Sequence, residues 1–514
     1  MTYRHGAWLV ALMAVANLEA VGNSVKLVDA VKQGNRAAVR TLITERANVN
    51  AAEPDGMTPL HWAVRGDDLQ TAQLLIRAGA NVKAASRYGI TPISLAAQNG
   101  NAPMVEMLLK AGADAKSAQP EGETVLMTAA RTGNPDIIRM LVSHGAEVNS
   151  KEGWQGQSAI MWAASENNAA AVKTLAELGA EVNGRSKALT FPEFKFETSG
   201  MVVTVLPRGG WTPLMYAARD GAIDAVRELA DAKADLNLAD PDGTTALMLA
   251  IINAHFDTAA ALIDKGANPN VTDSTGTAAL YAAVDMHTLG PMLSRPSPKL
   301  VDKLDAADIV KSLIAHGANP NARLKRPIIG RHHTPTGDAS LGEGATPLAR
   351  AAKSNDLVLM RMLFDAGADP RLTLKDRTTV AMIAAAGGAV VGAYAAAIPV
   401  TEASSLEAIK LCVEHGVDLN AFNTNGQTAL HGAAARGANS VVQYLADNGA
   451  KLDMKDKQGR TPLDVALGVG GAAGRRGGGG GTRGRGATPN EGTATLLREL
   501  MAKNGITVPA LAQP

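Results

Sequence analysis

Glycine recurs along this chain at a nearly constant spacing, and that spacing limits the fold more than any other feature of the sequence. Most steps between successive members of the series are 33 residues, and the series comprises Gly56, Gly89, Gly122, Gly156, Gly210, Gly243, Gly276, Gly344, Gly426 and Gly459. A fixed period of this length indicates one small supersecondary unit copied many times. Such a unit cannot bury its apolar face alone, so neighbouring copies must stack to form a core. The sequence therefore predicts a repeat array rather than several separate globular domains.

Residues 56–81 show the pattern of one unit. Thr58 is the type of residue that caps a helix N-terminus, and Pro59 suits the first helical position because its missing N–H would have no partner there. A short apolar helix follows, then a polar break at residues 65–68, then a second helix that ends at Gly79. Glycine tolerates the left-handed conformation that commonly follows a helix. Each unit is therefore predicted to be two short helices joined by a tight turn.

Two short motifs recur in these units. The T-P-L opening stands at residues 58–60, 212–214, 346–348 and 461–463, and the G-A closing stands at residues 79–80, 145–146, 266–267 and 317–318. Through these motifs the chain resembles the ankyrin repeat family from about residue 25 to residue 467, with a degenerate last unit to about residue 504. The resemblance implies an all-α fold, an ankyrin repeat solenoid of about 11–12 helix-turn-helix units with β-hairpin fingers and several loop inserts. Arg377 departs from the pattern, because it stands where the motif expects glycine.

Several stretches break the 33-residue period and are predicted to be loop inserts. They lie at residues 184–209, 287–305, 323–343, 387–405 and 468–493 of a single array over residues 25–504, which a tail at residues 505–514 follows. The first insert alternates Phe194 and Phe196 with charged residues, turns at Gly200, and continues as an apolar run. This period of two around a glycine turn predicts an elongated β-hairpin finger. The last insert is dense in glycine, a composition that disfavours an ordered core.

The N-terminus resembles a secretory signal. Arg4 precedes an apolar run at residues 7–16 that is too short to span a bilayer. Small residues at positions 14–16 provide a cleavage site. Residues 1–20 are therefore predicted to be a signal peptide, and the chain a periplasmic or secreted protein of bacteria; an amphipathic helix that caps the array is the alternative. No other apolar run in the sequence is long enough for a transmembrane helix.

Charge and motif content argue against nucleic-acid binding and against catalysis. The formal net charge is +1, whereas a dedicated nucleic-acid binder carries a clear positive excess. Arginines in the glycine-rich stretch resemble an RNA-binding tract, but a solvated loop is favoured. The sequence lacks the motifs of serine hydrolases, zinc proteases, phosphate-binding loops and dinucleotide-binding folds. We therefore expect a monomer with no enzyme activity, no cofactor and no nucleic-acid partner.

Histidines and the single cysteine fall mostly at positions that the repeat explains. Cys412 replaces a core leucine of the repeat and is predicted to be buried. His61 and His431 occupy the histidine position of the ankyrin motif, where the resemblance implies a hydrogen bond within the stack. The histidines that remain in inserts are candidates for a metal site, and they are His287, His332 and His333. Their spacing fits no common ligand pattern, so packing and hydrogen bonding in the loops are favoured.

The resemblance places partner contacts on the fingers and on the exposed edge of the first helix of each unit. Carried over by motif position, it selects Met57, Arg65, Arg87, Tyr88, Arg131, Trp154, Trp211 and Arg219, to which the predicted hairpin adds Phe194 and Phe196. Tryptophan, tyrosine and arginine concentrate binding energy at protein interfaces. Trp62 and Trp162 align with an apolar stacking position and are predicted to pack in the core. Scattered surface aromatics without a binding role are the alternative.

These patterns predict a non-enzymatic scaffold that binds a protein or peptide partner through the concave face of the array and its fingers. Arginine pairs bidentately with carboxylates while its plane stacks on aromatic rings, so the partner is expected to be acidic and apolar. The contrasting hypothesis is an accessory protein that binds a metal or small ligand through the histidine-containing inserts. Metal content after purification would distinguish the two.

Overall fold

The structure, a computed structural model of the chain, describes residues 25–190, 208–288, 302–326, 341–387, 400–469 and 489–507. Contacts between Cα atoms divide the chain into two compact units. Unit 1 comprises residues 1–189 and 209–235, and unit 2 comprises residues 190–208 and 236–514. A single continuous array over residues 25–504 remains a prediction.

Both units are built from short α-helices in pairs. Unit 1 contains a helix over residues 25–32, then α2 (Arg36–Thr44), α3 (Pro59–Arg65), α4 (Leu69–Arg77), α5 (Pro92–Gln98), α6 (Ala102–Lys110), α7 (Val125–Thr132), α8 (Pro135–Ser143), α9 (Ala159–Ser165), α10 (Ala169–Glu177), α11 (Pro213–Asp220) and α12 (Ile223–Asp231). Unit 2 contains α13 (Ala246–Ile252), α14 (Phe256–Asp264), α15 (Ala279–Thr288), α16 (Ala306–Ala315), α17 (Pro347–Lys353), α18 (Leu357–Asp365), α19 (Val380–Ala386), α20 (Glu402–Glu414), α21 (Ala429–Arg436), α22 (Asn439–Asp447), α23 (Pro462–Ala466) and α24 (Glu491–Lys503). The described residues thus hold twelve helix pairs, in agreement with the predicted 11–12.

Helix pairs begin and end as the motif predicts. Thr58 is the N-cap of α3 and Pro59 is its first residue, and the same arrangement recurs in α5 and α11. The cap satisfies N–H groups that the first turn of a helix leaves without a partner. After α4, Gly79 has a φ of +88°, a left-handed conformation that glycine adopts at little cost. Arg377, which replaces the finger glycine of its repeat, also has a positive φ, +66°. That finger therefore retains its turn without the glycine.

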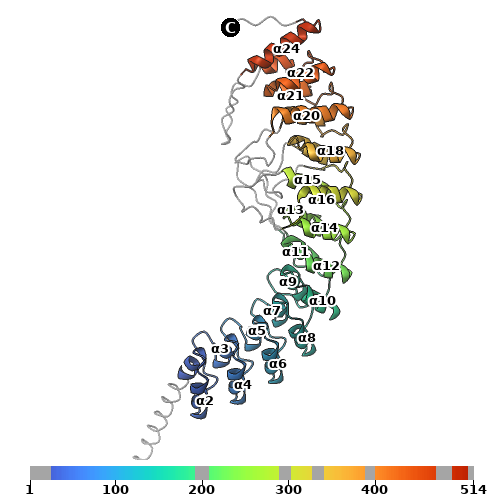
Figure 1. Cartoon of the computed structure of the whole chain (residues 1–514). Helices are drawn as coiled ribbons and strands as arrows, with labels where there is room; N and C mark the ends of the chain where they lie inside the picture. Colours follow the sequence, from blue (N-terminus) through green and yellow to red (C-terminus); the bar gives the residue numbers. More distant parts are fainter. Residues whose placement is uncertain are drawn as a thin grey trace, which may run out of the picture. The chain divides into compact units, whose positions relative to one another are not determined.

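Within each unit the helices stack in two rows (Figure 1). In unit 1 the first helices of the pairs pack in the order α3, α5, α7, α9, α11, and the second helices in the order α2, α4, α6, α8, α10, α12. In unit 2 the first helices pack in the order α13, α15, α17, α19, α21, α23, and the second helices from α14 to α24. Aliphatic side chains and alanines from both rows fill the interior. We call the row of first helices the first-helix row.

Asparagine side chains join successive pairs just beyond the second helices. The Asn50 side chain donates to the Gly79 carbonyl at 3.1 Å and accepts from the Asn81 N–H at 2.6 Å. The same two bonds recur at Asn149, Asn270, Asn321 and Asn420. Because one amide supplies both a donor and an acceptor, each asparagine fixes the spacing of two neighbouring pairs.

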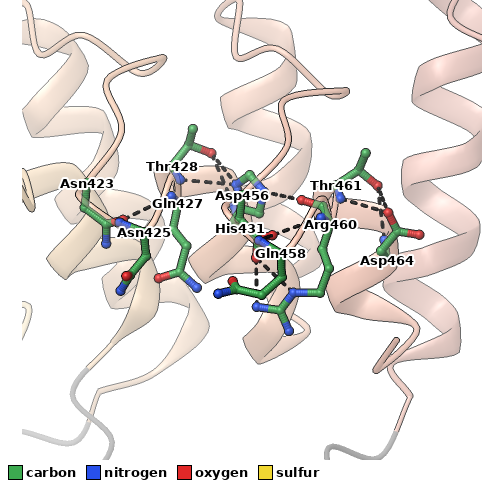
Figure 2. Close-up of polar contacts among 10 residues, drawn as sticks. All are labelled: Asn423, Asn425, Gln427, Thr428, His431, Asp456, Gln458, Arg460, Thr461 and Asp464. Carbon is green, nitrogen blue, oxygen red and sulfur yellow. Dashed lines mark hydrogen bonds and ion pairs between the residues drawn. The ribbon is translucent and has the colours of Figure 1, made fainter. Parts of the chain in front are cut away.

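A histidine at the third position of two first helices also links neighbouring pairs. In unit 2, His431 Nδ1 faces Thr428, and its Nε2 lies 3.1 Å from the carbonyl oxygen of Arg460 in the next finger (Figure 2). His61 makes the equivalent contacts in unit 1. The predicted bond within the stack is therefore confirmed for both histidines. Burial lowers the pKa of each imidazole, which favours the neutral ring.

The fingers differ from the predicted β-hairpins. Among the described residues they contain no strand, only isolated antiparallel bridges. The reason is their length: the bond from the Glu53 N–H to the Met57 carbonyl already closes the turn, which leaves no room for a ladder. Single backbone bonds then connect consecutive fingers, as from the Arg87 N–H to the Asp55 carbonyl. The fingers are tight turns, and the hairpin prediction is corrected to that extent.

Two predicted inserts end earlier than expected. Helix α20 begins at Glu402 and α24 begins at Glu491, each inside a stretch that the sequence assigned to a loop. Thr401 explains the first difference, because it forms a reciprocal capping box with Ser404. Cys412 on α20 is buried, as predicted, and burial raises the pKa of its thiol to about 12.

Some predictions concern segments outside the described residues. These are the signal peptide at residues 1–20, the hairpin that carries Phe194 and Phe196, and most of the glycine-rich insert. They stay predictions. Over the ranges that the structure describes, no helix combines the length and apolar content needed to cross a membrane.

Candidate functional site

The first-helix row of unit 1 presents two repeated positions, the fourth and the seventh residue of each helix. The fourth residues are Trp62, Leu95, Thr128, Trp162 and Tyr216, and the seventh residues are Arg65, Gln98, Arg131, Ser165 and Arg219. Residues three apart lie on the same face of a helix. Aromatic rings and arginines therefore share one face of unit 1. We call this face the aromatic–arginine strip, made of Trp62, Arg65, Arg131, Trp162, Tyr216 and Arg219. Tyr216 is buried, at 3% exposure, and Arg219 lies over its ring, so Tyr216 supports the strip from within.

Each arginine of the strip lies over an aromatic ring. The distances from guanidinium carbon to ring centroid are 5.2 Å for Arg65 and Trp62, 5.1 Å for Arg131 and Trp162, and 5.3 Å for Arg219 and Tyr216. The Arg131–Trp162 contact runs from α7 to α9, so it crosses from one repeat to the next. Such contacts contribute about 0.5–1 kcal/mol each at exposed sites. They hold each guanidinium plane against a ring, and Arg219 in addition pairs with Asp220.

Two finger residues add exposed rings beside this strip. Tyr88 is 59% exposed, and Trp154, at 76%, is the most exposed large hydrophobic residue in the described part of the chain. Arg87 lies 5.1 Å from the Tyr88 ring centroid and donates to its hydroxyl at 3.1 Å. Exposed rings of this size are the side chains that most often anchor a protein interface.

A surface pocket of about 420 Å³ lies next to Trp154. Its lining consists of Arg131, Glu152, Trp154, Gln155, Gln157, Met161, Trp162, Ser165, Glu166 and Arg219. These residues come from α7, α9, α11 and the finger before α9. The fold thus brings together three of the predicted contact residues, Arg131, Trp154 and Arg219.

The charged groups of the pocket differ in how well they are paired. Arg219 donates two bonds of 2.7 Å to Asp220, which raises the pKa of the guanidinium. The carboxylate of Glu152 is buried and accepts three N–H groups of its own finger. Arg131 lies 3.7 Å from Glu123, too far for a hydrogen bond. Arg131 is therefore ion-paired with Glu123, but its guanidinium donates no hydrogen bond to a described residue.

Two families of ankyrin repeats match this chain. The family described as ankyrin repeats in three copies matches residues 27–119, 93–186 and 197–287, and the family described as ankyrin repeats in many copies matches residues 413–466. Together these matches cover more than half of the sequence. The chain is an ankyrin repeat protein. Its fold class, a helical ankyrin repeat solenoid, is confirmed, and repeats of this family are generally non-catalytic modules of protein–protein interaction.

Individual relatives match only in part. Rat diacylglycerol kinase zeta is 32% identical over 132 residues, which is 25% of this chain and 12% of that protein. An ankyrin repeat domain-containing protein of monkeypox virus is 35% identical over 83 residues, 16% of this chain and 19% of that protein. The crystal structure of the human ASB11 ankyrin repeat domain matches with 27% identity over 46% of this chain and 96% of that chain, at a TM-score of 0.38. The chain spans less than a fifth of the length of the two relatives matched by sequence.

Two predicted contact residues of this ankyrin repeat protein lie in its interior. Met57 is 5% exposed and Trp211 is 6% exposed. Trp211 packs edge to face against Tyr216, at 5.4 Å between centroids, and Arg219 covers its ring. The expectation that Met57 and Trp211 face a partner is therefore corrected: both lie where the finger meets its first helix, and the stack covers them. The binding roles of Arg65, Arg87, Tyr88, Arg131, Trp154 and Arg219 stay predictions.

The metal-site candidates do not come together in the described residues. His287 on α15 lies 2.5 Å from the carboxylate of Asp356, the N-cap of α18. That hydrogen bond is the main cause that raises the pKa of His287. His332 and His333 lie outside the described residues, and within the described ranges no three His, Cys, Asp or Glu side chains could hold a metal ion. The metal-binding alternative thus has no support from this part of the chain.

Sequence reasoning missed the surroundings of Trp162. Trp62 and Trp162 are both predicted to pack in the core, but both are half-buried, and Trp162 lines the pocket. The available signal was the step from Gly122 to Gly156, which is one residue longer than the 33-residue period. The extra residue lies in the finger that carries Trp154, where the closing bond runs from the Glu152 N–H to the Gln157 carbonyl.

Proposed function

We propose that this ankyrin repeat protein is a non-enzymatic interaction scaffold that binds a protein or peptide partner, as a monomer, through the aromatic–arginine strip and fingers of unit 1. The observation that carries the proposal is the exposure of Tyr88 and Trp154 beside that strip. Leaving two large rings in water forgoes hydrophobic stabilisation of roughly 25 cal/mol for each Å² left uncovered. A partner that covers them regains that free energy.

The partner is proposed to be acidic as well as apolar. Arg65 and Arg87 have no carboxylate partner among the described residues, although each is stacked on a ring. Each guanidinium plane is therefore held against a ring, and both arginines are exposed to solvent. Carboxylate groups of a partner would pair with these donors, and apolar side chains beside them would pack on Tyr88 and Trp154.

Binding of a captured partner to ring-deleted variants tests the proposal. A partner is first isolated with the full chain from an extract of the source cell, and its affinity is then measured against Tyr88→Ala and Trp154→Ala. If these rings are anchors, each change weakens binding by about 1–2 kcal/mol or more, which is roughly tenfold. Thermal unfolding should not change, because both side chains are exposed.

Phe422→Ala supplies the matched control. Phe422 is 43% exposed in a finger of unit 2 and lies under Arg377, 5.0 Å from its guanidinium carbon. Like Tyr88, it is thus an exposed ring covered by an arginine, but it lies outside the proposed surface. The control variant should bind as well as the parent. If it loses as much affinity as Trp154→Ala, or if both unit 1 variants bind normally, the assignment to unit 1 is wrong.

We further propose that the protein acts outside the bacterial cytoplasm. The support is the apolar run at residues 7–16 with small residues at its end. Expression of the whole sequence in a bacterium, followed by N-terminal sequencing of the product in the envelope fraction, tests this. A product that begins near residue 17 or 21 fits export, whereas an intact Met1 in the cytosolic fraction contradicts it.

A further inference from the structure

Two tryptophans occupy the same helix position in unit 1 but have different surroundings. Trp62 is the fourth residue of α3, and its Nε1 donates to the carboxylate of Glu53 at 2.5 Å. The other oxygen of Glu53 accepts from Lys32, whose Nζ also lies 4.2 Å from the Trp62 ring centroid. One carboxylate thus bridges a cation on the ring and the N–H at the ring edge. The cluster of Lys32, Glu53 and Trp62 shows that a tryptophan at this helix position can hold a cation over its ring and a carboxylate at its N–H.

Trp162, the fourth residue of α9, has the cation but lacks the carboxylate. Arg131 lies 5.1 Å from its ring centroid, in the role of Lys32. The finger glutamate that corresponds to Glu53 is Glu152, since both donate the N–H that closes the finger. Because this finger is one residue longer, Glu152 turns inward and accepts three backbone N–H groups. The buried Trp162 Nε1 consequently has no hydrogen-bond acceptor among the described residues.

A buried indole N–H without an acceptor costs about 1–3 kcal/mol, and such groups are uncommon in folded proteins. Here the orphaned donor belongs to a residue that lines a pocket, next to a guanidinium whose ion pair with Glu123, at 3.7 Å, is too long for a hydrogen bond. Both groups would be satisfied by a single carboxylate. Glu123 does not supply it, because its oxygen lies 3.7 Å from Arg131 and already accepts from the Thr128 hydroxyl at 3.0 Å.

We infer that the Arg131–Trp162 pair is a carboxylate subsite, which takes an aspartate or glutamate side chain of an acidic peptide. The inference deepens the proposed function and rests on it. One carboxylate oxygen accepts from the Trp162 Nε1 and the other from the Arg131 guanidinium, as the Glu53 carboxylate does between Trp62 and Lys32. The side chain beside the acidic residue packs on the exposed Trp154 ring. Side chains at the pocket rim must shift to uncover the indole N–H.

Nuclear magnetic resonance of the indole groups tests the subsite directly. The chain has five tryptophans, so ¹⁵N-indole labelling of the full protein gives a small set of side-chain signals, and Trp162→Phe assigns the relevant one. The probe is an acetylated, amidated five-residue peptide that alternates glutamate and leucine. Its counterpart, with glutamine in place of glutamate, has nearly the same shape and no charge. The glutamate peptide should shift the Trp162 signal in a saturable manner, and the glutamine peptide should not.

Two variants make the outcome decisive. Arg131→Gln should weaken binding of the glutamate peptide at Trp162 by about tenfold, because a charge-assisted bond is lost. Glu53→Ala should open the same type of site in the first repeats, so that the Trp62 signal, silent in the parent, responds to the glutamate peptide. No response at Trp162, or an equal response to the glutamine peptide, would overturn the inference.

The failure of the subsite can be told apart from failure of the scaffold proposal. A captured partner that depends on Tyr88 and Trp154, together with a Trp162 signal that ignores the glutamate peptide, would leave the scaffold intact and rule out the carboxylate subsite. A Trp162 response with no dependence on Tyr88 and Trp154 would support the subsite as a peptide-binding pocket and remove the two finger rings from the interface.

Discussion

The same two positions of the first-helix row are used in opposite ways in the two units. In unit 1 the seventh residue of α7, Arg131, lies over the fourth residue of α9, Trp162, and its side chain is 40% exposed. In unit 2 the seventh residue of α15, Asp285, pairs with the fourth residue of α17, Arg350, and both are buried. One contact geometry between neighbouring repeats thus gives an open surface in unit 1 and a closed internal pair in unit 2.

The difference shows that a motif position does not by itself make a binding surface. A charge removed from water is stable only when its partners replace the lost hydration. Arg350 meets that requirement through Asp285 and through the Ser354 hydroxyl at 3.1 Å. Arg131 meets it only through a 3.7 Å ion pair with Glu123, and its side chain, 40% exposed, keeps contact with water and remains accessible to a ligand. The identity of the fourth and seventh residues decides between the two outcomes.

The largest effect that separates the units is expected on breaking their ion pairs. Asp285→Ala leaves the buried Arg350 without its carboxylate, and removal of one member of a buried pair costs about 3–5 kcal/mol. Asp220→Ala in unit 1 removes a carboxylate that pairs with Arg219, which is 38% exposed, and that accepts from the Ser165 hydroxyl. Both contacts are solvated, so the cost should be only about 1 kcal/mol. Hydrogen exchange of the amides in α15, α17 and α11 measures both costs locally. Equal destabilisation by the two variants would remove the distinction between an open and a closed contact.

A change outside the first-helix row should affect both units alike. Asn149→Ala in unit 1 and Asn321→Ala in unit 2 each delete the two bonds that join successive pairs. The expected cost is about 1 kcal/mol in each case, since these side chains are partly solvated and net hydrogen-bond contributions are small. Urea unfolding of the two variants, followed by circular dichroism, provides the values. A loss of stability in only one of the two variants would mean that the units differ in how successive helix pairs are joined, and not only in the first-helix row.

The smallest effect concerns pH: the stabilisation contributed by two histidines should change with pH in opposite directions. Asp356 raises the pKa of His287, so the stabilisation of α18 by that pair is complete below about pH 6.5 and is lost as the pH rises through the raised value. Burial lowers the pKa of His61, so its contribution is present above about pH 6.5 and is lost as the pH falls. NMR titration gives the pKa of both imidazoles, and amide hydrogen exchange of α18 and α3 at several pH values measures how the stability of each helix changes. His287→Gln should abolish the first trend and leave the second.

The period of the sequence predicted the helices, their caps and the buried Cys412, because those depend on local residue types and on a repeated register. It could not place Trp211 or Met57, since their burial depends on how a finger folds over its own first helix. It also predicted a core position for Trp162. The surroundings of that indole N–H depend on the direction of the Glu152 side chain, which no local pattern gives. Ion pairs such as Asp285 with Arg350 join residues on either side of two inserts, so no local pattern predicts them.

Oxidative footprinting of the complex with the captured partner tests the central claim most directly. Hydroxyl radicals modify exposed aromatic side chains, and Trp154, Tyr88 and Phe422 are 76%, 59% and 43% exposed in the free chain. We predict that the partner protects Trp154 and Tyr88 from oxidation and leaves Phe422 as reactive as before. Protection of Phe422 with unchanged reactivity at Trp154 and Tyr88 would contradict the assignment of the binding surface to unit 1.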